Sequence, residues 1–311
     1  MLPRDTYSQP AAADPVLDEQ TVLALARRHV RRASSLTGVD ESGGEARAYA
    51  IDEGIIFKTQ RPHRLRPRTS LEKEVFFLNQ LAAHPEISVP RVLGYGQDQG
   101  IEYICMSRMP GVAACTVELA GSNRSELLHE VGRTLRRIHT IPQDPFHGSS
   151  LFPGPRDRAG YLKRAETGFS QALPAIAADP KCWTLQVPPE DLAKAAVAAL
   201  PATIDLVALH SNPGPEHVFL DPETLRFAGL IDFGDAYVGP PAFDWRWPRP
   251  EDRLAILEGY GEGAPLPEDF LAGWRSTMVL MEMAALTSRP ERRVAALDNL
   301  AWLSREFRLG G

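Results

Sequence analysis

The sequence predicts an α+β fold with two lobes, a small β-rich N-terminal lobe and a larger helical C-terminal lobe. A chain of 311 residues with 43% hydrophobic side chains exceeds the usual single domain and can bury two unequal cores. Strand-like segments lie before about residue 107, and helical patterns dominate from about Val117 onward. We therefore expect a flexible N-terminus over residues 1–16, an N-terminal nucleotide-binding lobe over 17–106 and a C-terminal catalytic lobe over 107–311.

The net charge argues against a nucleic-acid partner. The chain has 34 Lys and Arg against 40 Asp and Glu, a balance of −6, whereas contacts to nucleic-acid phosphates need a basic surface. A cationic small-molecule substrate is compatible with this charge. The sequence does not indicate an oligomeric state.

Cysteine usage and hydropathy indicate the compartment. Cys105, Cys115 and Cys182 are odd in number and widely spaced, which predicts reduced packing residues of an intracellular protein. No apolar run approaches the roughly 18 residues of a membrane span, and the N-terminus lacks the apolar core of a signal peptide. We expect a cytoplasmic protein with no membrane partner.

The N-terminal lobe is predicted to contain two helices and a β-hairpin. A helix over residues 17–34 carries four arginines, which we interpret as a solvated face. The segments "ARAYAI" and "GIIFK" follow the turn-rich "DESGG" and predict a hairpin leading into a further strand. The segment "RTSLEKEVFFLNQLAAH" predicts a helix that begins with a capping box of Thr69 and Glu72. Its expected buried stripe is Leu71, Val75, Leu78 and Ala82.

A lysine and a glutamate in this lobe are candidates for an ion pair. At 100° per residue, Glu74 falls on the buried side of its helix, whereas Glu72 points away. Lys58 ends the apolar run "GIIF", and strand alternation can turn it inward toward the helix. The alternative is that both side chains extend from the lobe boundary into water.

The C-terminal lobe is predicted to contain a short strand, a hairpin and several helices. "LVALH" is typical of a buried strand, and "VFL" and "LRFAGLI" flank the turn "DPET" as a hairpin does. Trp245, Trp247 and Trp274 are interpreted either as pocket residues or as core. The expected helices cover residues 125–139, 156–177, 190–200, 251–260, 267–285 and 292–307.

The hairpin predicts a metal site next to a polar loop. Because a hairpin returns the chain to its starting point, His217 at its entry and Asp232 at its exit should be neighbours, with the loop over residues 210–216 beside them. A divalent ion such as Mg²⁺, held by one or two protein ligands, completes its shell with phosphate oxygens and water. Phosphate chemistry is the natural interpretation.

The segment "HSNPGPEH" followed by "IDFGD" is similar to the protein-kinase pattern H-R-D-L-x-x-x-N and D-F-G. It resembles more closely the aminoglycoside phosphotransferase family, including its macrolide-kinase relatives, over about residues 36–300. This resemblance implies a protein-kinase-like fold and Mg²⁺-dependent transfer of phosphate from ATP or GTP to a small-molecule hydroxyl.

The resemblance also implies roles for individual residues. Lys58 matches the lysine that contacts the nucleotide phosphates, and Glu74 matches the helix acid paired with it. Asp232 matches the main metal ligand, His217 the second metal ligand, and Asp244 an acid that braces the catalytic loop. The segment "ICMSRMPG" resembles the hinge, whose backbone around Ser107 and Met109 would bind adenine. The nucleotide loop has no G-x-G-x-x-G, so its candidate phosphate contacts are Ser42, Gly43 and Gly44.

One departure from the family pattern concerns the catalytic position. The residue that matches the family's catalytic aspartate is Asn212, which can accept a hydrogen bond but cannot take a proton. Losing a general base typically costs about 10²–10⁴ in rate, although phosphoryl transfer depends chiefly on positioning and charge neutralisation. His210 and Glu216 are alternative bases, but in this motif His210 usually has a structural role and Glu216 points away.

Three functional hypotheses follow. The first is a slow small-molecule kinase, with aminoglycosides, macrolides or metabolite alcohols as acceptors. The second is a catalytically inactive pseudokinase that binds nucleotide or ligand. The third is that Asn212 is an engineered or sporadic change in an active kinase. Acids that could attract a cationic acceptor, or lie on solvated helix faces, are Asp235, Glu251, Asp252, Glu258 and Glu262.

Overall fold

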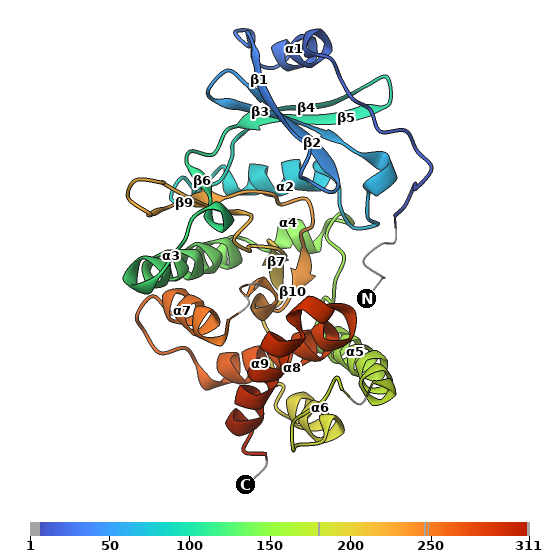
Figure 1. Ribbon diagram of the computed structural model, residues 1–311, viewed down its shortest axis with the longest axis vertical. Helices are drawn as coiled ribbons and strands as arrows, with labels where there is room; N and C mark the ends of the chain where they lie inside the picture. Colours follow the sequence, from blue (N-terminus) through green and yellow to red (C-terminus); the bar gives the residue numbers. More distant parts are fainter. Residues whose placement is uncertain (1–6, 180, 246, 248, 310–311) are drawn as a thin grey trace. The chain divides into compact units, whose positions relative to one another are not determined.

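The computed structural model describes residues 7–179, 181–245, 247 and 249–309 (Figure 1). They form an α+β kinase-like fold, as predicted, in which a five-stranded antiparallel sheet is followed by a largely helical part. The chain divides into two compact units. The first comprises Met1–Leu119 and Pro215–Ala236, and the second comprises Ala120–Gly214 and Tyr237–Gly311. The proposed lobe boundary near residue 107 stays a prediction.

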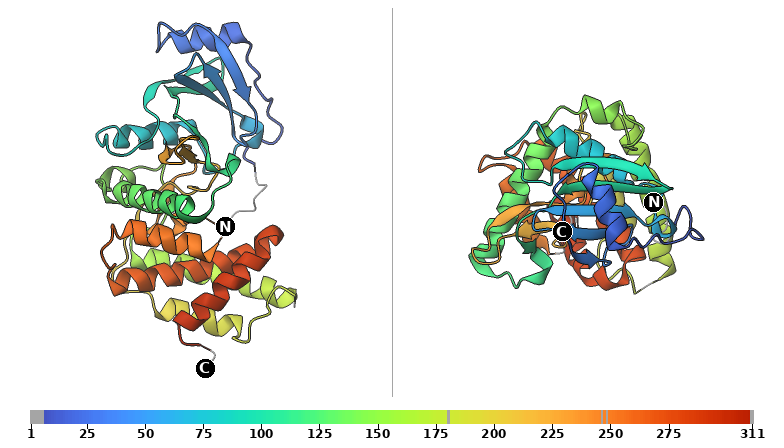
Figure 2. Two further views of the ribbon diagram at one scale, coloured as in Figure 1. Left: turned by 60° about the vertical axis from the view of Figure 1, so that its left-hand side comes forward. Right: turned by 90° about the horizontal axis from the view of Figure 1, so that it is seen from above.

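The sheet of the first unit has the order β1-β2-β3-β5-β4. Side chains alternate across it, so that Tyr49 and Phe57 are buried on the face covered by α1, together with Val22 and Leu25 of that helix. Figure 2 shows α2 on the opposite side of the sheet from α1. Lys58 follows Phe57 and therefore lies on the α2 side. The elements are α1 Glu19–Arg27, β1 Leu36–Asp40, β2 Ala46–Ile51, β3 Ile55–Gln60, α2 Leu71–Leu81, β4 Val92–Asp98 and β5 Ile101–Ser107.

The start of α2 differs from the predicted capping box. Ser70 is the N-cap, and its hydroxyl accepts a hydrogen bond from the Lys73 amide at 3.1 Å, because the serine hydroxyl is one residue closer to the first turn. Thr69 instead donates to Asp235. The predicted orientation of the acids is correct, with Glu74 buried and Glu72 exposed.

The buried stripe of α2 is only partly as expected. Leu71 and Leu78 are buried, but Val75 is half-buried and Ala82 is exposed. Their places in the core are taken by Phe77, Leu81 and Lys73. The helix is therefore rotated so that a lysine, and not a valine, faces inward beside Glu74.

A three-stranded sheet of order β6-β8-β9 completes the first unit. Its strands are β6 Val112–Ala113, β8 Val218–Leu220 and β9 Phe227–Leu230. β8 and β9 are antiparallel, which confirms the predicted hairpin. The end of this hairpin is joined to the loop after α2, because the Leu230 amide donates to the Ser88 carbonyl at 3.0 Å.

Part of the predicted flexible N-terminus lies against the first unit. Residues 1–6 are outside the described residues, but the Ser8 amide donates to the Leu65 carbonyl at 2.8 Å. Further along, the Asp14 carboxylate lies between Arg47 and Arg61, at 2.9 and 2.8 Å.

Helices dominate the second unit, and the predicted helices are present with small shifts of their ends. They are α3 Gly121–Thr140, α4 Asp144–His147, α5 Arg158–Ala178, α6 Pro189–Ala198, α7 Pro250–Tyr260, α8 Glu268–Ser288 and α9 Arg293–Glu306. Helices α3 and α7 approach closely because Gly132 and Gly259 face each other's backbones. A Cβ on Gly132 would lie 2.1 Å from the Ile256 carbonyl oxygen. The strand β7 Val207–Leu209 pairs antiparallel with β10 Tyr237–Gly239.

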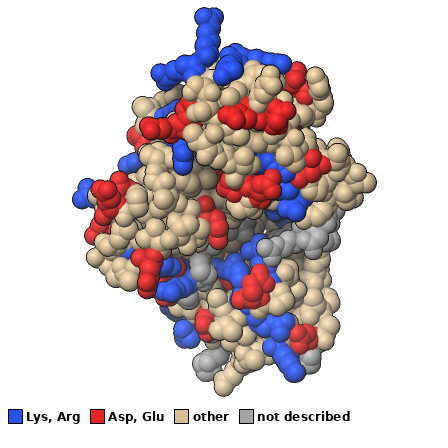
Figure 3. Space-filling model, turned by 45° about the horizontal axis from the view of Figure 1, so that its top comes forward, with Lys and Arg blue, Asp and Glu red and all other residues tan. Residues whose placement is uncertain are grey.

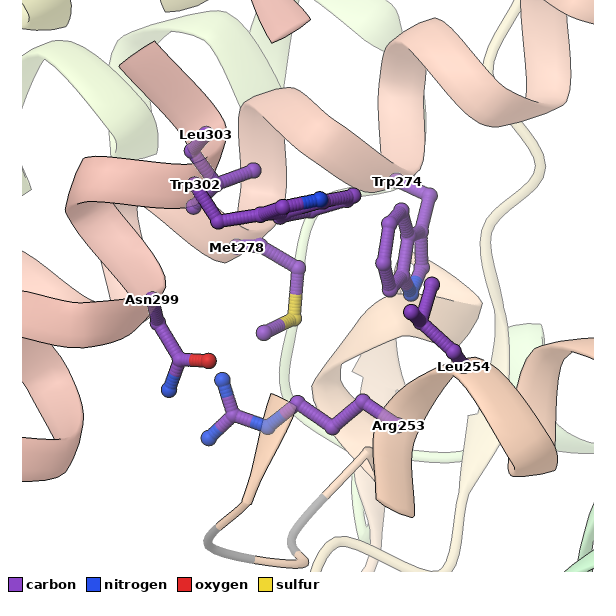
Figure 4. Close-up of a pocket in the computed structure, with 7 residues that line it drawn as sticks. All are labelled: Arg253, Leu254, Trp274, Met278, Asn299, Trp302 and Leu303. Carbon is purple, nitrogen blue, oxygen red and sulfur yellow. The ribbon is translucent and has the colours of Figure 1, made fainter. Parts of the chain in front are cut away.

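The three tryptophans belong to the core of the second unit. Trp245 and Trp247 are fully buried and Trp274 nearly so. Trp274 also lines a cavity of about 10 Å³ between α7, α8 and α9, which it shares with Arg253 and Asn299 (Figure 4). That volume holds about one water molecule, so this cavity is too small for an acceptor.

Two of the three cysteines are packing residues, as predicted, and the cytoplasmic location stays a prediction. Cys105 and Cys182 are buried, as expected for packing residues, but Cys115 is exposed. Among the described residues, no helix combines the length and the apolar character needed to cross a membrane.

Lys73, the buried lysine of α2, should make the free energy of unfolding depend on pH. Burial lowers the pKa of Lys73 from 10.5 to about 8, although Asp235 acts in the opposite direction. Unfolding restores the ordinary pKa, so between pH 8 and 10.5 the unfolded chain binds more protons than the folded chain. The stability contributed by this lysine is therefore complete above pH 10.5 and lost as the pH falls toward 8.

We predict that the free energy of unfolding of the parent protein, relative to a Lys73→Met variant, rises by about 2 kcal/mol between pH 8 and 10. Denaturant titrations across this range measure it. The exposed Lys163→Met variant is the control and should show a constant difference from the parent. A constant difference for Lys73→Met as well would contradict the assignment.

Candidate functional site

An ion pair predicted between β3 and α2 is present in the first unit. Lys58 Nζ lies 2.8 Å from Glu74 Oε2 and 2.9 Å from Asp232 Oδ1. The Glu74 side chain is 1% exposed, Lys58 14% and Asp232 42%. The buried glutamate thus fixes the lysine on one side, and the half-exposed aspartate holds it on the other.

The pKa values of this trio reflect burial and mutual attraction. Burial alone would lower the pKa of Lys58, but Asp232 and Glu74 more than offset it and raise the pKa. Burial raises the pKa of Glu74, Lys58 acts against this, and Asp232 adds to it. At neutral pH, Lys58 is therefore a permanent cation.

The hairpin β8–β9 brings His217 and Asp232 together, as predicted. The Ile231 amide donates to the His217 carbonyl at 3.0 Å, and His217 Nε2 lies 3.4 Å from Asp232 Oδ2. Asp232 has φ 72°, in the left-handed region that a non-glycine residue rarely adopts. The strained backbone directs its carboxylate toward both Lys58 and His217.

The turn between β1 and β2 is built around glycine and arginine. A Cβ on Gly43 would lie 2.7 Å from the Ala46 carbonyl oxygen, whereas one on Gly44 would meet nothing within 4 Å. Arg61 donates to the carbonyl oxygens of Glu41 and Gly43, at 3.4 and 3.3 Å. The Ser42 amide donates to Asp40 at 2.8 Å. The turn therefore has a defined shape without a G-x-G-x-x-G sequence.

At the predicted hinge, most backbone donors already have partners. The Ser107 amide donates to the Arg91 carbonyl and the Arg108 amide to the Gly54 carbonyl, at 2.8 and 2.9 Å. Among the described contacts of residues 107–109, the Met109 amide is the remaining donor. The adenine contact of Ser107 and Met109 stays a prediction, with the Met109 amide as its remaining backbone donor.

Sequence reasoning missed a further group of charged residues in the first unit, around Arg66. Arg66 donates through Nε to Glu45, and its Nη2 lies 2.5 Å from Asp235 Oδ2. The other oxygen of Asp235 accepts a hydrogen bond from Thr69 Oγ1. The "IDFGD" motif could have indicated the importance of Asp235, but nothing local in the sequence identifies Arg66 as its partner.

In the second unit, Asp244 is the centre of the loop that follows β7. Its fully buried carboxylate accepts hydrogen bonds from the backbone amides of His210 and Ser211, at 2.9 and 2.6 Å. His139 Nε2 lies 2.9 Å from the same group, and His139 Nδ1 lies 3.1 Å from the Tyr260 hydroxyl. His139 was missed by the sequence analysis. The geometry supports the proposed bracing role of Asp244.

The loop places Asn212 at the surface of the second unit. The Asn212 side chain is exposed, whereas His210 is fully buried. The backbone N–H of Asn212 donates to His210 Nδ1 at 3.3 Å, and Trp247 Nε1 donates to the Pro213 carbonyl at 3.0 Å. Ser211 has φ 77°, which turns the chain sharply between the buried and the exposed residue. Glu216 is exposed in the first unit.

Several acids proposed to attract a cationic acceptor have internal partners. Asp252 is 1% exposed and receives two hydrogen bonds from Arg124, at 2.7 and 2.6 Å. Glu258 lies 3.0 Å from His129, and Asp235 is held by Arg66. Glu251 and Glu262 are exposed. On the face drawn in Figure 3, acidic and basic side chains alternate in small groups.

Comparison with known proteins gives matches over most of the chain. The model of a family described as "Phosphotransferase enzyme family" matches residues 38–276. An aminoglycoside 3′-phosphotransferase from Streptomyces ribosidificus is 29% identical over 177 residues, which is 55% of this chain and 64% of that protein. One from Streptomyces fradiae is 25% identical over 205 residues, 63% of this chain and 72% of that protein. The match thus spans less than two thirds of the first relative.

Solved structures share the fold at low sequence identity. A macrolide 2′-phosphotransferase from Brachybacterium faecium has a TM-score of 0.54 at 19% identity, covering 89% of this chain and 97% of its own. The GDP complex of aminoglycoside 2′-phosphotransferase-IIIa has a TM-score of 0.59 at 14% identity, covering 93% and 99%. The ternary complex of APH(2″)-IIa with streptomycin and ATP has a TM-score of 0.52 at 15% identity, covering 95% and 100%.

Removing the buried carboxylate beneath the loop should be costly. In an Asp244→Ala variant, two backbone amides and His139 lose their acceptor in a dry interior, so we predict a loss of about 3–5 kcal/mol in the free energy of unfolding. Asp244→Asn keeps one acceptor oxygen and should lose less. Denaturant titration measures both, with the exposed Glu251→Ala as control. A loss for Asp244→Ala no larger than the control's would show that the loop does not depend on this group.

Proposed function

The chain belongs to the phosphotransferase enzyme family, and we propose that it transfers the γ-phosphoryl group of ATP or GTP to a hydroxyl of a small molecule, slowly and with Mg²⁺. The observation that carries this proposal is Lys58 held between buried Glu74 and half-exposed Asp232, with His217 beside the latter. A fixed cation next to two potential metal ligands could bind the phosphates and the metal ion of a nucleoside triphosphate.

The first unit supplies the proposed nucleotide contacts. Lys58 binds phosphate oxygens, and its partner Glu74 keeps the ammonium group from turning away. Gly43, with Ser42 and Gly44, lets the turn between β1 and β2 approach the phosphates closely. The Met109 amide, the hinge donor without a described partner, binds the nucleobase edge. Relatives with this fold were solved with GDP and with ATP.

Asp232 and His217 are the proposed metal ligands. No group of three or more His, Cys, Asp or Glu side chains suited to a metal occurs among the described residues. This fits an ion that takes one or two protein ligands and completes its shell with phosphate oxygens and water. Bound there, Mg²⁺ would neutralise charge on the transferring phosphate.

The local charges make the nucleotide interaction metal-dependent. Glu74 and Asp232 surround Lys58, and Glu45 and Asp235 share Arg66. With Lys73 near Asp235, four carboxylates face three cations, so the region has no excess positive charge to attract a bare triphosphate. A divalent ion reverses this balance. We therefore expect ATP to bind far more weakly in the presence of a chelator.

Asn212 is the proposed acceptor-orienting residue. The exposed side-chain amide of Asn212 can accept a hydrogen bond from a substrate hydroxyl but cannot take the proton. His210 is not proposed as the base, because its imidazole is fully buried and its Nδ1 already accepts a hydrogen bond from the backbone N–H of Asn212. The reaction then depends on positioning and on charge neutralisation, which accounts for a slow rate.

The acceptor is proposed to be an antibiotic or metabolite alcohol. The curated relatives are aminoglycoside 3′-phosphotransferases, and a structural relative is a macrolide 2′-phosphotransferase. Asp235 and Asp252 are paired with arginines, whereas Glu251, Glu258 and Glu262 are exposed and could attract a cationic acceptor.

Calorimetric titration tests the nucleotide half of the proposal. We expect ATP or GTP to bind with Mg²⁺, and binding to be lost in an Asp232→Ala variant and with EDTA. The absence of nucleotide binding in the parent protein would refute the kinase proposal. A screen of antibiotic and metabolite alcohols for ADP release then identifies the acceptor.

Substituting Asn212 by aspartate distinguishes a slow kinase from a binding protein. If only the proton acceptor is lacking, Asn212→Asp should raise turnover by about 10²–10⁴, equivalent to about 3–5 kcal/mol of barrier. Nucleotide affinity should change little. ADP release with and without candidate alcohols, beside the parent protein, measures it. A rate near zero for both proteins across a broad panel would favour the pseudokinase.

A matched pair of glycine substitutions tests the turn between β1 and β2. Gly43→Ala places a methyl group 2.7 Å from the Ala46 carbonyl oxygen and must distort the turn, whereas Gly44→Ala meets open space. We predict that Gly43→Ala weakens Mg-nucleotide binding about tenfold, the effect of about 1.4 kcal/mol, and that Gly44→Ala leaves it within about twofold of the parent. Equal affinities for the two variants in calorimetry would remove this turn from the site.

A further inference from the structure

One arginine connects the two acidic segments that border the proposed nucleotide site. Arg66 lies in the connection between β3 and α2. Its Nε donates to Glu45, the residue before β2, and its Nη2 lies 2.5 Å from Asp235. Both carboxylates are shielded, with side-chain exposures of 21% and 25%. Burial raises the pKa of Glu45, and Arg66 counteracts this. The guanidinium therefore compensates two carboxylates that would otherwise repel each other.

The segment that carries Arg66 is itself fixed to the "IDFGD" motif. Thr69 donates to Asp235, and the Ser70 amide donates to the Gly234 carbonyl at 3.3 Å. Buried Lys73 donates to the Arg68 carbonyl. Asp235 follows the proposed metal ligand Asp232 by three residues, so this anchor and Asp232 belong to one short segment.

The turn between β1 and β2 needs such an anchor. It contains Asp40, Glu41 and Glu45 and lacks the glycine pattern of other nucleotide loops. At one end of the turn, Arg47 Nε pairs with Glu41 at 2.7 Å. At the other end, Glu45 is paired with Arg66. Without this second pair, the carboxylate of Glu45 would be left partly buried near Asp235 and Asp232, both of which raise its pKa.

We propose that Arg66 is a positioning residue of the nucleotide site, which joins Glu45 to Asp235 and so holds the turn between β1 and β2 against the segment that carries Asp232. This inference rests on the proposed function for its effect on nucleotide binding. The bridge itself is a property of the nucleotide-free chain. Because Arg66 acts through its carboxylate partners, substituting Arg66 and substituting Glu45 should both loosen the turn between β1 and β2.

A direct role in phosphate binding would behave differently. The Arg66 side chain is 39% exposed, and Nη1 has no hydrogen-bond partner among the described residues. If Arg66 bound the triphosphate itself, Glu45→Gln would release the guanidinium, and affinity would stay constant or improve. If Arg66 positions the turn, Glu45→Gln and Arg66→Gln should weaken binding alike.

The experiment compares Arg66→Gln, Glu45→Gln, the double variant and the exposed Arg64→Gln as matched control. In the nucleotide-free protein, amide hydrogen exchange of Ser42 and Arg61, whose amides donate to Asp40 and to the Glu45 carbonyl, should quicken about tenfold in the first three proteins and stay unchanged in the control. In calorimetry with Mg-ATP, each single variant should bind about tenfold more weakly, and the double variant should be no weaker than Arg66→Gln, because that variant already removes the contact with Glu45. Arg66→Lys, with a single point of contact, should fall between parent and Arg66→Gln.

Three results would overturn the positioning role. One is unchanged exchange of the Ser42 and Arg61 amides in both single variants. The second is faster exchange across the whole chain, which would show general destabilisation. The third is weaker binding in Arg66→Gln with unchanged or tighter binding in Glu45→Gln, which would make Arg66 a direct ligand. If the parent protein binds no Mg-ATP, the proposed function fails, and hydrogen exchange alone still decides whether the bridge holds the turn.

Discussion

The burial of Lys58 beside Glu74 is the constraint on which the rest of the first unit depends. An ammonium group on the inner face of a sheet is tolerated only when a carboxylate accompanies it, and removing either partner would leave an uncompensated charge. Glu74 can accompany it only if α2 keeps its rotation, and that rotation also buries Lys73 and exposes Glu72. The helix cap at Ser70 and the hydrogen bond to Gly234 fix the start of this helix. One ion pair thus determines the orientation of α2.

The two aspartates of "IDFGD" are close in sequence but differ in exposure and in the residues they contact. Asp232 is 42% exposed, has a left-handed backbone conformation and contacts Lys58 and His217. Asp235 is three quarters shielded and contacts Arg66 and Thr69. The first carboxylate is partly exposed, and the second joins elements of the chain. A short motif therefore contains both an accessible carboxylate and a shielded one that connects it to neighbouring elements.

Local periodicity was sufficient for some features, although it misplaced Val75 and Ala82 in the buried stripe of α2. The hairpin β8–β9 predicted the proximity of His217 and Asp232, and the helical wheel of α2 predicted the inward position of Glu74. The cap was misplaced by one residue, because Thr69 and Ser70 are chemically equivalent caps and only the tertiary contact of Thr69 with Asp235 distinguishes them. Arg66 and His139 were missed since their aspartate partners, Asp235 and Asp244, lie more than 100 residues away in the sequence. Long-range charge pairs leave no local pattern.

The loop around Asn212 is supported through its backbone. Asp244 accepts hydrogen bonds from both backbone amides at the start of the loop, His139 contacts Asp244, and Trp247 donates to the Pro213 carbonyl. These contacts depend on the backbone of residues 210–213 and not on the side chain at 212. An aspartate and an asparagine have nearly the same shape, so exchanging them alters the proton chemistry of this position without altering its support. The loop geometry is therefore compatible with either residue, so asparagine and aspartate at position 212 would differ in charge and proton chemistry alone.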